Sequence, residues 1–535
     1  MAAVVQTLLF MLAELAAVAV VAKRLNVSPS ILLVIAGICM ALIPGLPRVE
    51  LAPEVVLLVI LPPLIYSAGV AMSWREFKFN LRPIGLLAFG CVIFTTCAIA
   101  AAVHYLLHFD WAVGFLLGAI ISPTDVVAPL AIARQLGLPR RIIVVLEGEG
   151  LANDATALVL YKFAVVAIST GTFSAKDASV TFPLIVVGET LYGLAIGWLS
   201  LHLRRWAREP RVEITLSLMT PYLAFWVPAH LGGSGVLATV ACGLYVSWNG
   251  PLLIPPATRL QGIFFWDLIV YLIEGLVFLV TGLQARTLIE QSHAFSIREL
   301  LVTAAWTTVI AIIARFLWIF PATYVPRWVS PSLAERDPAP SWQTPFFLSF
   351  TGIRGVVSLA VALAIPYTTA VGAPFPHRDL ILFVTFGVII ITLIVQGTML
   401  PWVVRWLGLN SLAHLEHEKE IHAELRARVS ALKEVEKRFD RLISERELPN
   451  DVIELLRTRN QSRSQILPDN LQGSLEQMRL SASVKKDLID AERKFIYQLL
   501  RDGKITDEAR RRIEYELDLE EAGVANRGKD GGGWM

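Results

Sequence analysis

The sequence predicts an all-α polytopic membrane protein that ends in a separate, charged helical tail. Of its 535 residues, 55% are hydrophobic and 17% are charged, and the mean hydropathy of +0.59 is far above that of a soluble globular protein. The charges gather at one end, because the last 125 residues hold 48 of the 92 Asp, Glu, Lys and Arg residues. We therefore expect a transmembrane domain over residues 1–410 and a cytoplasmic domain over residues 411–535.

About thirteen apolar segments precede residue 410. Their centres lie near residues 12, 36, 60, 95, 120, 155, 190, 220, 240, 272, 308, 358 and 392. The first, from Met1 to about Val21, lacks a preceding basic stretch, so we interpret it as a membrane helix rather than a cleaved signal. The four cysteines all lie in apolar segments and show no metal-site or CxxC spacing, which argues against disulfides and zinc.

The distribution of basic residues predicts the orientation in the membrane. With the N-terminus outside, the cytoplasmic connections hold fifteen Lys and Arg residues and the outside connections hold five. Cytoplasmic loops carry an excess of these residues, and the opposite orientation would reverse the ratio. We therefore expect a multi-pass protein of the cell (inner) membrane, with its N-terminus outside and its tail in the cytoplasm.

Two apolar segments are interrupted at corresponding places. Thirteen segments divide into six and six around the seventh, and the two groups would have inverted topology because segment 1 runs inward and segment 8 outward. Ser122-Pro123-Thr124 interrupts the fifth segment of the first group, and Thr351-Gly352-Ile353-Arg354-Gly355 interrupts the fifth of the second. Such pairs of interrupted helices in inverted repeats indicate a transport site near the midplane of the membrane.

Three carboxylates lie inside two neighbouring apolar segments. Asp125 belongs to residues 111–132, and Glu149 and Asp154 belong to residues 142–169. A charge at this depth costs roughly 2.5–3.5 kcal/mol on insertion scales, so it marks an ion or proton pathway by default. The alternative is a pair of protonated, hydrogen-bonded carboxyls in a helix interface. We also expect Gly148 and Gly150 to loosen the second segment and free carbonyl groups there.

Asn153-Asp154 is the sharpest chemical signal in the chain. A cation such as Na⁺ needs several oxygen ligands once its water is removed, and a carboxylate beside an amide carbonyl supplies them. The same carboxylate can take a proton instead, and one group that binds either ion but never both is sufficient for exchange. An Asn-Asp pair in a soluble chain would be a helix cap or a loop, but the apolar flanks favour a place within the membrane.

Helix geometry places the two acidic side chains of the second segment on different faces of the helix. Glu149 lies about 40° from Asn153 and about 140° from Asp154, so we expect Asp154 to face the ion and Glu149 to face a structural partner. The candidate partners are the membrane cations Arg315 and Arg354, although Arg315 could instead reach the cytoplasmic surface. Glu274 is a weaker candidate, either an accessory acid or an interface hydrogen bond.

The tail is predicted to be helical. Residues 416–446 carry interleaved charges with a spaced apolar face, Leu448-Pro449-Asn450 ends that helix, and residues 460–470 form a polar linker. Two further helices, over residues 483–500 and 506–519, follow. We expect a regulatory or assembly module whose ligand is unknown.

Several motifs together resemble those of the monovalent cation/proton antiporter family, which includes bacterial Na⁺/H⁺ antiporters and eukaryotic sodium/proton exchangers. The motifs, in order, are Leu61-Pro62-Pro63-Leu64-Ile65, SPTD at 122–125, EGEGLAND at 147–154, Arg315 and GIRG at 352–355. The resemblance covers about residues 1–410. It implies a thirteen-helix inverted-repeat fold with crossed interrupted helices, a homodimer, and alternating access by an elevator-like movement.

The resemblance also implies roles for individual residues. Asp154 would bind the cation or the proton, with Asn153 as the neighbour typical of electroneutral exchangers. Asp125 and the Thr124 carbonyl would complete the Na⁺ site, with Ser122 supporting it. Glu149 would pair with Arg315, and Arg354 would balance the dipole ends of the interrupted helix. Where the family commonly has Ser, this chain has Gly150, so a hydroxyl ligand is missing and K⁺ is an alternative to Na⁺.

The leading hypothesis is therefore a secondary antiporter that exchanges Na⁺, with Li⁺ or K⁺ as alternatives, for H⁺, and so serves pH homeostasis and sodium tolerance. A cation channel would need rings of charge or repeated filter loops, which the sequence lacks. A third class is an ion sensor whose tail signals. The sequence contains no nucleophile–base set, so we expect no enzymatic activity, no cofactor and no nucleic-acid partner.

Overall fold

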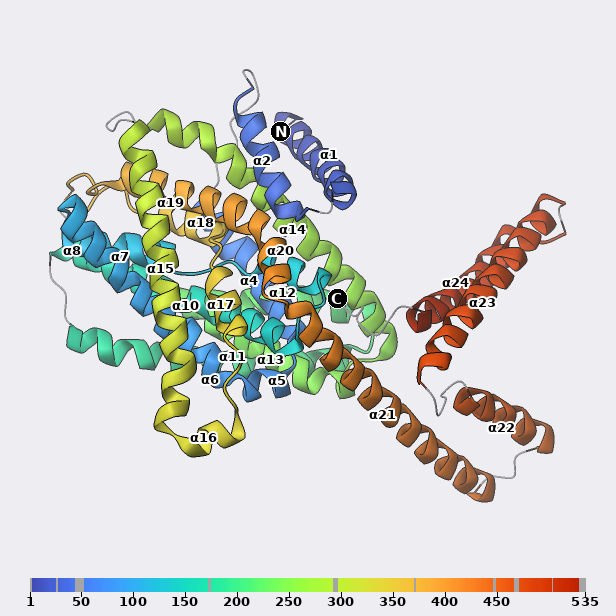
Figure 1. Ribbon diagram of the computed structural model, residues 1–535. Helices are drawn as coiled ribbons and strands as arrows, with labels where there is room; N and C mark the ends of the chain where they lie inside the picture. The colour runs from blue at the N-terminus through green and yellow to red at the C-terminus, as the bar shows by residue number, and fades with distance from the viewer. Residues whose placement is uncertain are drawn as a thin grey trace. The chain divides into compact units, whose positions relative to one another are not determined.

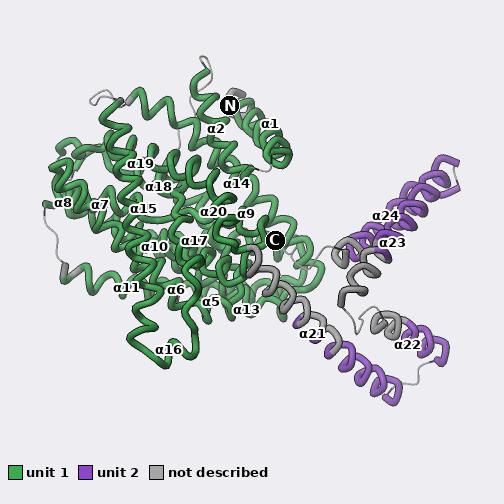
Figure 2. Tube along the Cα trace, in the orientation of Figure 1, with its two compact units in different colours: residues 1–410 green, residues 411–535 purple. Residues whose placement is uncertain are grey.

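The computed structural model describes residues 2–25, 27–43, 52–171, 175–291, 297–369, 372–445, 449–465, 471–502 and 504–528. Within these ranges the chain is helical, apart from turns, loops and one isolated bridge between Thr368 and Pro374. It divides into two compact units, residues 1–410 and residues 411–535 (Figure 2). Each unit is described by itself below.

The first unit is a bundle of long apolar helices (Figure 1). Its helices are α1 (Ala2–Leu25), α2 (Pro29–Ala41), α3 (Pro53–Val55), α4 (Leu61–Ala71), α5 (Trp74–Phe79), α6 (Leu81–Gly85), α7 (Val92–Leu107), α8 (Trp111–Ile121), α9 (Val127–Gln135), α10 (Arg140–Thr170), α11 (Ala175–Ala207), α12 (Pro210–His230), α13 (Val236–Leu253), α14 (Pro256–Gln291), α15 (Ile297–Val329), α16 (Pro331–Arg336), α17 (Gln343–Phe350), α18 (Val356–Leu363), α19 (Arg378–Ile391) and α20 (Gly397–Trp406). Short π-helical turns, Val56–Ile60, Leu86–Cys91 and Thr392–Gln396, join α3 to α4, α6 to α7 and α19 to α20.

Eight helices of the described residues are long and apolar enough to cross a membrane. The prediction of an all-α polytopic membrane protein is thus confirmed. The predicted number of thirteen crossings and the inverted repeats stay predictions.

Both predicted interruptions are breaks between two short helices. Residues 122–126 separate α8 from α9, and residues 351–355 separate α17 from α18. Pro123 contributes to the first break, because it has no N–H group to donate to a carbonyl of the preceding turn. The two breaks touch, since the Asp125 N–H donates to the Ile353 carbonyl at 2.7 Å.

Gly148 and Gly150 do not loosen the helix that carries them, so that prediction was wrong. The helix α10 runs without interruption from Arg140 to Thr170. The two glycines instead permit close packing: a Cβ at position 148 would lie 2.4 Å from the Ile84 side chain, and one at position 150 would lie 2.5 Å from the Val126 side chain. An isolated glycine does not interrupt the i→i−4 hydrogen bonds of a helix. The effect of these two glycines is instead to make room for the side chains that pack against α10.

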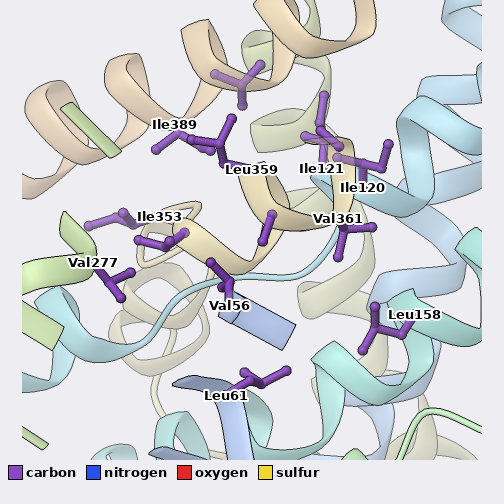
Figure 3. Close-up of a cluster of buried hydrophobic side chains, with 14 of the residues drawn as sticks. Val56, Leu61, Ile120, Ile121, Leu158, Val277, Ile353, Leu359, Val361 and Ile389 are labelled. Atoms are coloured by element: carbon purple, nitrogen blue, oxygen red, sulfur yellow. The ribbon is translucent and has the colours of Figure 1, made fainter. Parts of the chain in front are cut away.

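Buried aliphatic side chains surround the two breaks. One cluster joins residues from α4, α8, α10, α14, α18 and α19, and Figure 3 shows part of it. Among its members Ile121 ends α8 and Ile353 lies in the second break, and neither is exposed. Between helices, small residues allow close contact in the way typical of membrane proteins: Gly37 of α2 faces Gly282 of α14, and Gly69 of α4 faces Gly243 of α13.

The second unit is built from charged helices. They are α21 (Leu409–Glu445, which begins at the end of the first unit), α22 (Asn450–Gln465), α23 (Leu471–Arg501) and α24 (Asp507–Gly528). The helices α23 and α24 pack together through Ile489, Leu517 and Ile513, and Arg493 forms ion pairs with Asp518 and Glu521. Residues 460–465 belong to α22, so the predicted polar linker was wrong there, because polar residues alone do not end a helix.

Candidate ion-binding site

The predicted site residues come together where the first break meets α10. Thr124 and Asp125 lie in the extended segment between α8 and α9, and Glu149, Asn153 and Asp154 lie in the middle of α10. The Asn153 Nδ2 group donates to the Thr124 carbonyl at 2.8 Å and to its hydroxyl at 3.2 Å. These two bonds attach the break to α10.

Glu149 and Arg315 form a buried, two-pronged ion pair. The distances are 2.5 Å for Nη1–Oε1 and 2.9 Å for Nη2–Oε2, and the two side chains are 2% and 3% exposed. Arg315 therefore does not reach the surface, and Arg315 rather than Arg354 contacts Glu149. The Thr124 hydroxyl donates to Glu149 at 2.8 Å, so the charge of this acid is fully balanced and bonded.

Two buried guanidinium groups meet the C-terminal ends of the interrupted helices. Arg354, in the second break, donates from Nε to the carbonyl of Ile121 at the end of α8, at 3.0 Å, and from Nη1 to Gly352. Arg315 donates from Nε to Leu348 near the end of α17, also at 3.0 Å. Free carbonyls at a helix C-terminus carry partial negative charge, which these cations offset. A fixed positive charge therefore lies at each break: Arg354 at the end of α8 and Arg315 near the end of α17.

Asp154 stands in contrast to Glu149. Within the described part of the chain it accepts no hydrogen bond and forms no ion pair, although it lies in the middle of a membrane-spanning helix. Among the described residues, the charged group that acts on it is Asp125, which also acts on Glu274 of α14. Asp125 itself accepts one bond, from the Val127 N–H at 2.9 Å, which caps α9. Carboxylates that repel one another within a membrane favour the binding of a proton or a metal cation.

Asn153 bonds to the break through its amide nitrogen and leaves its carbonyl oxygen, the predicted ligand atom, unbonded in the described part of the chain. Its amide group donates to Thr124, while its Oδ1 is buried and has no hydrogen-bond partner among the described residues. Buried polar atoms are nearly always bonded, and an orphan acceptor in a site of this kind fits a cation or a donor that arrives with the substrate. The Thr124 carbonyl has a second lone pair beyond the bond from Asn153, so it too can take a ligand.

Ser122 and Gly150 shape the site without facing it as ligands. The Ser122 hydroxyl returns to the Ala119 carbonyl of its own helix at 3.3 Å. Gly150 lies against Val126, which sequence reasoning missed because nothing in a single sequence reveals that the break passes over this glycine. Gly355 is likewise pressed against Asp125, with an added Cβ only 2.1 Å from its Oδ2.

We expect Gly150→Ser alone to lower stability and Val126→Ala to rescue it. The serine side chain would overlap Val126, and overpacking of this kind costs about 1–3 kcal/mol, whereas the double substitution exchanges the volumes. The measurement is the apparent melting temperature of purified protein in detergent, followed by Na⁺ and K⁺ exchange in vesicles. Equal stability of Gly150→Ser with and without Val126→Ala would contradict the contact.

Two intramembrane charges were also missed. Lys162, on α10, donates to the carbonyls of Gly232 and Gly233, and Glu189, on α11, accepts from the Gly235 N–H at the start of α13. Together they hold the turn before α13. The sequence could have identified both residues, because each is a charged residue within an apolar segment.

Comparison with known proteins agrees with this architecture. The family model described as "Sodium/hydrogen exchanger, transmembrane" matches residues 10–406. A Mycobacterium tuberculosis protein named as an uncharacterised Na⁺/H⁺ exchanger is 33% identical over 512 residues, which cover 94% of this chain and 93% of that one. A sodium, potassium, lithium and rubidium/H⁺ antiporter of Bacillus pumilus is 34% identical over 377 residues, 68% of this chain and 56% of the relative.

The fold is also similar to that of a solved structure. The sodium proton antiporter MjNhaP1 of Methanocaldococcus jannaschii superposes with a TM-score of 0.59 at 18% identity, over 75% of this chain and 98% of that one. This likeness concerns the fold alone, whereas the family model and the mycobacterial relative span most of the sequence. The chain therefore belongs to the transmembrane sodium/hydrogen exchanger family.

Proposed function

We propose that this protein exchanges Na⁺ for H⁺ across the cell membrane and that Asp154 binds the two ions in turn. The observation that carries the proposal is the contrast between two acids on one helix. Glu149 is neutralised by Arg315 and Thr124, whereas Asp154, five residues later, has no fixed partner and lies within reach of the charge of Asp125. A membrane-buried carboxylate without a counter-charge is stable only with a proton or a cation bound.

The neighbours of Asp154 suit this alternation. Asp125 and the Thr124 carbonyl offer oxygen ligands from the break, and the orphan Oδ1 of Asn153 offers another. Because Arg315 and Arg354 hold the helix ends at the break, the carbonyls near them keep their positions whether the site holds a proton or a cation. Glu274 is proposed as an accessory acid that adds negative potential to the approach.

The wider features of the family extend the proposal. We propose a homodimer with thirteen crossings in two inverted repeats, an elevator-like movement, the N-terminus outside and the tail in the cytoplasm as a regulatory or assembly module. The reaction is transport without catalysis or a cofactor. K⁺/H⁺ exchange is the alternative, which the Gly150–Val126 contact and the broad ion list in the name of the Bacillus relative favour.

The test is ion exchange in proteoliposomes with Na⁺, Li⁺ and K⁺ compared side by side. An antiporter moves protons only when a cation is present on the opposite side. A channel instead follows the membrane potential, and a sensor moves nothing. Proton movement that K⁺ drives and Na⁺ does not would replace the Na⁺ proposal with its alternative.

Exchange is expected to be electroneutral. With Asn153 beside it, Asp154 is the one titrating group that the proposal assigns to the ion, so one cation replaces one proton and no net charge crosses. The measurement is the rate of Na⁺/H⁺ exchange under a fixed Na⁺ gradient while K⁺ and valinomycin clamp the potential at different values. A rate that rises steeply with voltage would show a different stoichiometry.

A further inference from the structure

A cluster of three arginines surrounds one aspartate at one end of the membrane unit. Asp337, just after α16, accepts from Nη2 of Arg82 at 3.0 Å, of Arg141 at 2.7 Å and of Arg327 at 2.8 Å. The arginines come from α6, α10 and α15. Figure 1 shows α5, α6 and α16 toward the same end of this unit. We call these four residues the Arg82 cluster.

The Arg82 cluster carries more positive charge than its structure uses. Three guanidinium groups against one carboxylate leave two positive charges, and the nearby Arg140 is already matched by Glu76 through two bonds. Arg82 is also poorly bonded: its Nε and Nη1 are buried without a hydrogen-bond partner in the described chain. A single structural ion pair would need one arginine, so the excess charge and the unused donors indicate an anion.

The position of the cluster indicates which anion. Arg82 lies at the start of the candidate span 81–107, Arg141 at the start of the span 140–170, and Arg327 near the end of the span 298–329. Lipid phosphates lie at this depth. Exposed apolar side chains flank the arginines in sequence, with Leu81 53% exposed and Trp328 85% exposed. A site for a free anion has no need of such neighbours, whereas a lipid brings acyl chains to cover them.

We propose that the Arg82 cluster binds the headgroup phosphate of an anionic membrane lipid. Arginine is suited to this task because its planar fork meets two phosphate oxygens at once. Asp337 holds the three guanidinium groups together and competes with the phosphate for them. The Arg82 and Arg141 side chains are partly exposed, at 27% and 37%, so a phosphate can approach them from outside the helix bundle.

The site would influence the ion-binding region through shared helices. Arg141 is on α10 eight residues before Glu149, and Arg327 is on α15 twelve residues after Arg315. The same two helices are therefore joined twice, once by the buried ion pair and once at the membrane surface. A bound lipid would strengthen the connection between α10 and α15 at the membrane surface.

The test is native mass spectrometry of the purified full-length protein with dioleoyl phosphatidylglycerol or dioleoyl phosphatidylcholine. Arg82→Gln is expected to weaken retention of the anionic lipid about fivefold, the effect of one basic residue at a membrane surface, and to leave the zwitterionic lipid unchanged. Arg205→Gln, which removes an exposed arginine of α11 outside the cluster, serves as the matched control and is expected to match the native protein.

Asp337→Asn distinguishes a lipid site from a purely structural cluster. Removal of the competitor is expected to raise phosphatidylglycerol affinity severalfold, whereas a cluster with only a structural role would lose stability and gain no affinity. Arg141→Gln provides a second loss-of-binding variant should Arg82→Gln fold poorly. Unchanged lipid retention in either arginine variant would overturn the proposal. So would millimolar inorganic phosphate raising the melting temperature as much as phosphatidylglycerol, because the site would then bind free anions.

Discussion

Asp154→Asn is expected to abolish Na⁺-driven proton movement in proteoliposomes while leaving the protein folded. The amide cannot release a proton and carries no charge to hold a cation, so both halves of the exchange are lost. The fold does not depend on this carboxylate, because it makes no hydrogen bond or ion pair within the described residues. Its removal also relieves the repulsion between Asp154 and Asp125. We therefore expect an apparent melting temperature equal to or above that of the native protein.

Asp267→Asn is the matched control. Asp267 is exposed and lies on α14, so the same chemical change there is expected to leave transport and stability intact. The decisive measurement is the dequenching of a pH-sensitive dye inside vesicles after addition of Na⁺. Retention of more than a few per cent of the native rate by Asp154→Asn would refute the assignment of the ion to this residue.

Breaking the Glu149–Arg315 pair is expected to have the largest effect on stability. Either Glu149→Ala or Arg315→Ala leaves an unpaired charge at a position no more than 3% exposed, which typically costs about 3–5 kcal/mol. The Arg315 substitution also removes one of the two donors to the Leu348 carbonyl, which keeps the bond from the Thr351 hydroxyl, and the Glu149 substitution removes the acceptor of the Thr124 hydroxyl. Both single variants should therefore melt well below the native protein.

Glu149→Leu with Arg315→Met is expected to recover most of that loss. Apolar residues of similar size remove the charge penalty, leaving only the smaller deficit of the Leu348 and Thr124 groups. Some transport should persist in the double variant, since Asp154 rather than Glu149 is assigned to the ion. Thermal unfolding of all the variants in one detergent gives the coupling energy. Single losses that simply add would mean that the two charges do not stabilise each other.

Sequence reasoning could select candidate residues wherever a rule about energetic cost applies to a single residue. A charge within an apolar run is expensive wherever it occurs, and this marked Asp125, Glu149 and Asp154, while Pro123 marked the first break. Sequence reasoning failed where the role of a residue depends on which residue of another segment packs against it. Gly150 was interpreted as a weak point of its helix because the sequence does not reveal Val126 beside it.

The same limit explains two other features. The Asn153 side chain can donate or accept a hydrogen bond. It donates to Thr124 because the first break places the Thr124 carbonyl beside the amide nitrogen. Arg82 and Asp337 are 255 residues apart, and no local pattern predicts that they meet. In the tail, residues 460–465 are polar, but polarity predicts exposure rather than the end of a helix.

The bond between the two breaks has a consequence for how the protein is made. Asp125 and Ile353 are separated by 228 positions, so the amide of the first break has no partner until α17 and α18 have left the ribosome. At about 5–20 residues per second this interval lasts on the order of 10–45 s. An unsatisfied backbone group within hydrocarbon costs several kcal/mol. We therefore expect nascent chains stalled before residue 353 to be less stable in the membrane than the full-length chain and to be degraded faster by membrane proteases.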